Sequence, residues 1–160
     1  MSHPALGLPP TDMTAGSPAA ADRLVAATQR LGAKALAIAI DADPTLRERQ
    51  GEDGLRHLLR DTEILIDRLA RSLSSGDPKF AREWAEQVAV LYRRRRVPMD
   101  DVVAIAEGLR TASEGVLAPG ERAPLDAAID EAVRVFRWHR RIAGDARKRN
   151  RILRFIYKGA

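Results

Sequence analysis

The sequence predicts an all-helical fold, either a five-helix bundle or a globin-like arrangement, that ends in a long C-terminal helix. Apolar residues recur three and four positions apart along most of the chain, which is the spacing of one helix face. No window alternates apolar and polar residues for long enough to form a strand. Glycines and prolines separate the periodic stretches and favour short connections between helices.

The composition is that of one globular domain. The chain has 160 residues, of which 45% are hydrophobic and 31% charged, so it can bury a core of its own. It has no cysteine, which excludes disulfides and thiolate chemistry and favours a reducing compartment. The longest apolar run, 35–40, is far shorter than the roughly 20 residues of a membrane span, and no secretory signal is recognisable. We therefore expect a cytoplasmic protein.

Three segments are expected along the chain. Residues 1–17 are rich in proline and small residues and predict a flexible leader. Residues 18–143 carry the helical periods and predict a sensor or interaction domain. Residues 144–160 mix basic and apolar side chains and predict a basic amphipathic extension.

The first half of the domain begins with two proline start signals. Ser17 and Pro18 suit the N-cap and first position of a helix over 18–41. A second signal at Pro44 starts a short helical turn, which two glycines interrupt, namely Gly51 and Gly54. The clearest helical period follows, from Leu55 to Leu73, and is expected to end at Gly76.

The second half contains three more helices. One is expected from Pro78 to the arginine run 93–96, which suits either a solvated helix end or contact with phosphate or an acidic partner. Pro98 starts the next helix, which Pro119 and Gly120 end. The last helix is expected to begin at Glu121 or close to Pro124.

The last helix carries an apolar seven-residue repeat, which is typical of a helix covered by a partner helix. We expect this repeat to be the seam of a homodimer and the output element of the domain. The seam residues are Leu125, Ala132, Val135, His139 and Ile142. His139 within this seam is also a candidate for pH-sensitive packing. Gly144 follows the seam and predicts a hinge, since glycine costs about 1 kcal/mol relative to alanine inside a helix.

Positive charge is concentrated at the C-terminus. From Arg134 to Ala160 there are ten basic residues and one acid, a net charge of +9, whereas the rest of the chain has 17 basic and 21 acidic residues, a net charge of −4. Such a segment attracts an acidic protein or nucleic acid. We expect an acidic partner protein, keep nucleic acid as the alternative, and do not expect a membrane surface. The expected partner-binding residues are Arg147, Lys148, Arg149, Arg151, Ile152, Arg154, Phe155 and Ile156.

No catalytic or metal site is expected. The adjacent carboxylates Asp100 and Asp101 would point about 100° apart on a helix, so they do not converge on one substrate atom. No phosphate-binding, dinucleotide-binding or serine-nucleophile motif occurs. We expect no cofactor, and haem ligation through His57 or His139 is the alternative. Phe80 and Trp84, one turn apart, are expected to pack in the core, with a ligand pocket as the alternative.

Two stretches of the chain carry a family resemblance. They are LRHLLRDTEILIDRLARSL at 55–73 and GDPKFAREWAEQVAVLYRRRRVPMDDVVAIAEGLR at 76–110. Together they resemble the helical N-terminal domain of RsbR-type stressosome proteins and the related segment of PucR-type regulators. The resemblance implies a globin-like fold without haem and a dimeric sensor or partner-binding domain. No STAS, kinase or DNA-binding segment follows it here, so we expect a free-standing module or an output on another polypeptide.

These observations predict a non-enzymatic cytoplasmic signalling or regulatory module of the stress-response type. We expect it to dimerise and to bind a partner protein through its C-terminal helix. The alternative is a nucleic-acid-binding protein that uses the basic C-terminal segment.

Overall fold

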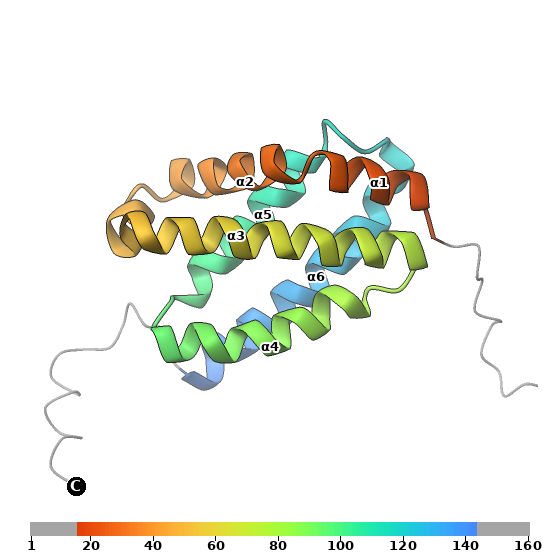
Figure 1. Ribbon diagram of the computed structural model, residues 1–160. Helices are drawn as coiled ribbons and strands as arrows, with labels where there is room; N and C mark the ends of the chain where they lie inside the picture. The colour runs from red at the N-terminus through yellow and green to blue at the C-terminus, as the bar shows by residue number, and fades with distance from the viewer. Residues whose placement is uncertain (1–15, 144–160) are drawn as a thin grey trace, which may run out of the picture.

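The computed structural model describes residues 16–143, and every regular element in that range is a helix. The six helices are α1 (Pro18–Ala26), α2 (Thr28–Ala42), α3 (Thr45–Ser75), α4 (Lys79–Arg95), α5 (Met99–Ser113) and α6 (Pro119–Ala143) (Figure 1). The all-helical class is therefore confirmed. None of the helices in residues 16–143 combines the length and the apolar character that a membrane span requires.

The prediction of a single helix over 18–41 is wrong, because the chain forms two helices there, α1 and α2. Ala27 separates them with φ −101° and ψ 6°, outside the helical region. The hydroxyl of Thr28 donates a hydrogen bond of 2.8 Å to the carbonyl of Val25, and such back-bonding bends helices. This break gives the described domain six helices.

Helix α3 consists of two helical segments that meet at Gly51. Gly51 has φ 63° and ψ 177°, a conformation open to glycine, so the interruption predicted there is confirmed. Gly54, by contrast, lies inside the helix. The helix ends as predicted at Gly76, whose φ of 71° is the left-handed conformation of a C-cap.

The starts of α5 and α6 show what proline does at a helix end. Pro98 is extended, with ψ 129°, and α5 follows directly as predicted. Helix α6 starts at Pro119, two residues before Glu121, and Pro124 lies inside it. The Glu121 carboxylate accepts a 2.9 Å hydrogen bond from the backbone N–H of Ala118, so it caps the helix from its third residue and allows the earlier start.

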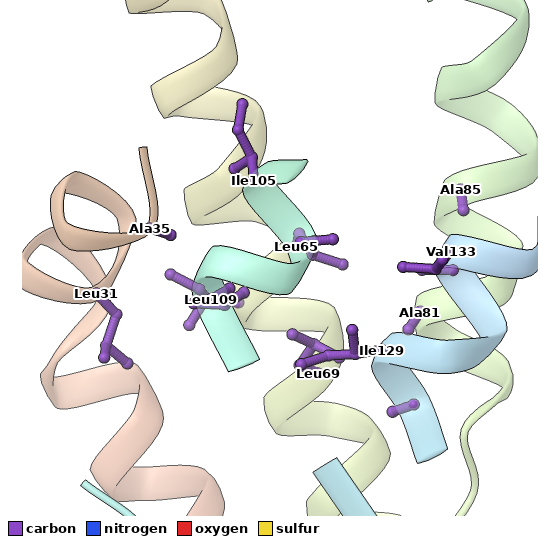
Figure 2. Close-up of a cluster of buried hydrophobic side chains, with 14 of the residues drawn as sticks. Leu31, Ala35, Leu65, Leu69, Ala81, Ala85, Ile105, Leu109, Ile129 and Val133 are labelled. Atoms are coloured by element: carbon purple, nitrogen blue, oxygen red, sulfur yellow. The ribbon is translucent and has the colours of Figure 1, made fainter. Parts of the chain in front are cut away.

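In Figure 1, α3 lies between α1 and α2 on one side and α4 on the other, and α5 and α6 cross behind it. Helix α2 packs on α5, α1 on α3 and α4 on α6. The core between them is built from leucine and isoleucine of α2, α3, α5 and α6 against alanines, as Figure 2 shows for Leu31, Ala35, Leu65, Leu69, Ala81, Ala85, Ile105, Leu109, Ile129 and Val133. Small side chains of α4, such as Ala81 and Ala85, pack against α6. The C-terminal ends of both helices lie at one end of the molecule (Figure 1).

Candidate partner-binding surface

The predicted seam of α6 is divided between the core and the surface. Leu125 and Ala132 are buried inside the chain's own core. Val135 is half-buried, His139 is buried, and Ile142 is 52% exposed. Of the five seam residues, only Val135 and Ile142 therefore have surface that a helix of a second copy could contact. The first half of the repeat stabilises the monomer by apolar burial.

Large apolar side chains are exposed where α4 and α6 end. Trp138 is 50% exposed and lies one turn before Ile142 on α6, while Val90 on α4 is 40% exposed. Val90 shares a helix face with Glu86, four positions before it, and with Arg93, three positions after it. Helix α4 packs on α6, and the charges of Glu86 and Arg93 both act on His139. We call Val90, Val135, Trp138 and Ile142 the α4–α6 face.

His139 lies beneath this face without a hydrogen bond to Nδ1 from any residue in 16–143. Its ring is perpendicular to that of Trp138, with centroids 4.9 Å apart. Burial lowers the pKa of His139, the positive charge of Arg93 lowers it further, and Glu86 opposes both. The imidazole is therefore held toward its neutral form, as expected for a buried ring that packs against an aromatic neighbour.

Basic side chains surround the α4–α6 face. Arg140 pairs with Asp100 at 3.2 Å, and Arg137 approaches Glu107 at 3.9 Å, which ties α6 to α5. Arg93 and Arg94 on α4 and Arg141 on α6 are exposed and form no ion pair with a residue of the described domain. Positive charge thus gathers at the end of the molecule from which the basic segment 144–160 continues.

Phe80 and Trp84 are placed in different surroundings. Trp84 packs edge to face on Phe136, with centroids 6.2 Å apart and rings at 87°. Phe80 is half-buried beneath Lys79, whose Nζ lies 5.2 Å from the ring centroid. Phe80 and Trp84 belong to the N-terminal half of α4. An open cleft of about 670 Å³ lies at the C-terminal end of the same helix, and neither aromatic residue lines it. A ligand pocket at Phe80 and Trp84 stays a prediction.

The adjacent carboxylates turn away from each other, as expected for neighbours in a helix. Asp101 is fully buried and paired with Arg49, whereas Asp100 pairs with Arg140. His57 is exposed, with Nδ1 2.7 Å from the carbonyl oxygen of Asp53. Residues 16–143 contain no group of three acidic or histidine side chains that could hold a metal ion. Haem ligation by His57 or His139 stays an untested alternative.

The predicted partner-binding residues lie outside the described part of the chain, as does Gly144 with its predicted hinge. They are Arg147, Lys148, Arg149, Arg151, Ile152, Arg154, Phe155 and Ile156.

Sequence reasoning missed the cleft because its walls come from segments that are distant along the chain. One wall is α3 between Arg49 and Asp61, and the other is the end of α4 with the turn before α5. The sequence does mark one wall, because the arginine run 93–96, followed by Pro98, suits contact with phosphate or an acidic partner.

Comparison with known proteins found no matching family and no curated protein of significantly similar sequence.

Proposed function

We propose that the chain is a non-enzymatic regulatory module of the cytoplasm that forms a homodimer through the α4–α6 face. In the same proposal, residues 147–156 bind an acidic partner protein. The observation that carries the proposal is that two helices packed on each other expose large apolar side chains, Val90 on α4 and Trp138 and Ile142 on α6. Apolar side chains grouped inside a polar rim are typical of protein interfaces.

The chemistry of the α4–α6 face suits a second copy of the same chain. The face is built from two helices that pack on each other, so a second copy can contact both of them at once. Trp138 supplies a large aromatic anchor of the kind that dominates binding energy. A two-fold arrangement would bring Trp138 and Ile142 of both copies together. The resemblance to RsbR-type domains supports the same proposal, with the six helices in a globin-like arrangement.

Charge supports an acidic partner for the segment that follows α6. The chain from Arg134 onward carries a net charge of +9, and Arg93 and Arg94 on α4, which packs on α6, add exposed guanidinium groups. An isolated guanidinium is costly to bury, so a partner that covers these residues must supply carboxylates. Ile152, Phe155 and Ile156 would supply the apolar part of the contact.

Nucleic acid is the second candidate partner, since the same positive charges can neutralise phosphates. Fluorescence anisotropy distinguishes the two with labelled poly-L-glutamate and labelled mixed-sequence duplex DNA, each titrated with the full chain and with a chain that lacks Asp145–Ala160. We expect poly-L-glutamate to bind and to lose at least about tenfold in affinity on truncation, with the helical circular dichroism of the core retained.

Tighter binding of DNA than of poly-L-glutamate, with a steep salt dependence, would favour the nucleic-acid function. Unchanged affinity for both probes in the truncated chain would contradict both candidates.

A further inference from the structure

The cleft near the end of α4 is formed by two walls that are each held in place. On the α3 side, the buried carboxylate of Asp101 accepts hydrogen bonds from Arg49 at 2.7 Å and from Gln50 at 2.8 Å. On the α4 side, the N–H of Val97 donates to the carbonyl of Tyr92 at 2.9 Å. A cleft of about 670 Å³ with such fixed walls is large enough for a small organic molecule.

The charged groups of the cleft leave an excess of positive charge. Arg49 is matched by Asp101 and Asp43, at 2.7 and 2.8 Å. Asp61, the acid among the lining residues, accepts a 2.9 Å hydrogen bond from the hydroxyl of Tyr92. Burial raises the pKa of Tyr92 above its usual range and Asp61 raises it further, so the phenol keeps this proton.

Two guanidinium groups remain for a ligand. Arg95 and Arg96 line the cleft and form no ion pair with any residue of the described domain. Arg96 has φ 61°, the left-handed conformation that usually belongs to glycine at the end of a helix. An arginine there carries a conformational cost that a side-chain function of its guanidinium would explain.

The remaining lining gives the cleft an apolar part and one further polar contact. Leu58, Val97 and Pro98 provide aliphatic surface beside the ring of Tyr92. Because a carbonyl only accepts, His57 donates from Nδ1 to Asp53, which leaves Nε2 as the ring nitrogen available to a ligand.

We propose that this cleft binds a small organic anion, in which a carboxylate or phosphate group pairs with Arg95 and Arg96 while an apolar body lies against Leu58, Val97 and Tyr92. Guanidinium groups recognise both anions by paired, charge-assisted hydrogen bonds. The site is separate from the α4–α6 face and does not depend on the function proposed above.

The test is an NMR titration of the ¹⁵N-labelled full chain with phenylacetate and with phenyl phosphate, which separates the two acid groups. Inorganic phosphate supplies the charge without an apolar body, and benzyl alcohol supplies the body without the charge. We expect at least one organic anion to bind saturably, with shifts of the amide signals of Leu58 and Val97, and both control compounds to bind at least about tenfold more weakly.

The variant Arg95→Ala with Arg96→Gly should weaken that binding at least about tenfold. The matched control, Arg93→Ala with Arg94→Ala, removes the same charge from the same run but leaves the cleft intact, so its affinity should stay within about twofold. The proposal is overturned if neither organic anion binds saturably up to about 10 mM, if a control compound binds as tightly, or if both double variants lose the same affinity.

Discussion

The carboxylate of Asp101, fully buried at the start of α5, receives the guanidinium of Arg49 from a position 52 residues earlier in the chain. Nη2 of Arg49 lies 2.7 Å from Oδ1, and Nε lies 3.4 Å from Oδ2. The same Nη2 is 2.8 Å from Oδ2 of Asp43. These bonds attach the turn between α2 and α3 to the N-terminus of α5, where a negative charge is also favoured by the helix dipole.

Replacing Asp101 should therefore destabilise the domain strongly. Asp101→Ala leaves Arg49 and Gln50 facing a buried gap without their shared acceptor. Because Arg49 would keep only the partly exposed Asp43 and Gln50 would lose its acceptor, we expect a loss of about 2 kcal/mol in the free energy of unfolding, measured by urea denaturation. The control Asp53→Ala breaks an exposed pair with Arg56 and should cost under about 0.5 kcal/mol. Equal losses in the two variants would contradict this account.

Asp43 should make stability fall in acid. Hydrogen bonds from the Thr45 hydroxyl and then from Arg49 lower the pKa of Asp43 from 3.8 to about 2. A lowered folded-state pKa contributes stability that is fully present above the unfolded-state value and is lost as pH falls toward the folded-state value. Urea midpoints should thus decrease between about pH 4 and pH 2, and Asp43→Asn should decrease less over that interval. Parallel pH profiles for the two chains would refute the assignment.

Gly108 should not tolerate a methyl group. A Cβ at this position would lie 2.5 Å from the carbonyl oxygen of Ala35, where α2 crosses α5. Although alanine favours a helix by about 1 kcal/mol, the clash is with backbone, so Gly108→Ala should lower the free energy of unfolding by about 2 kcal/mol. Gly120→Ala provides the comparison, since no atom lies within 4 Å of its Cβ. Thermal or urea denaturation of both variants checks the difference, and a stabilised Gly108→Ala chain would disprove the close packing.

His139 should make stability fall below neutral pH. Its pKa is lowered from 6.5 by burial and then by Arg93, with Glu86 acting in the opposite direction. The unfolded chain therefore binds the proton more readily, so stability is fully present above about pH 6.5 and decreases as pH falls below it. In His139→Gln, the urea midpoint should change less between about pH 7.5 and pH 5.5 than it does in the unmodified chain. If the midpoint depends on pH as steeply in the variant, other groups cause the effect.

Elements of the fold that depend on local sequence could be predicted. Gly76 and Pro98 act through their own backbone conformations, so the end of α3 and the start of α5 were placed correctly. The break at Ala27 depends on a side chain, since the Thr28 hydroxyl bonds to the backbone of the preceding turn. An alanine-rich sequence that favours helix on both sides gives no sign of it.

The candidate site was harder to predict, because burial depends on the whole fold. Asp100 and Asp101 are identical neighbours in sequence, yet Asp101 is fully buried because Arg49 reaches it from α3. The seven-residue repeat of α6 likewise predicts a covered stripe without saying which helix covers it. Leu125 and Ala132 are covered by the chain's own helices, which leaves Ile142 at the surface.

The central claim is that the α4–α6 face joins two copies of the chain, and light scattering during size-exclusion chromatography at micromolar concentration tests it most directly. We expect the full chain to have twice the mass of one chain, which is 17.6 kDa. Trp138→Glu should shift it to the monomer mass, because a charge would be buried in the interface. Val25→Glu, which changes a similarly exposed apolar residue on α1, should leave the dimer intact. A full chain that stays monomeric, or a dimer unaffected by Trp138→Glu, would contradict the claim.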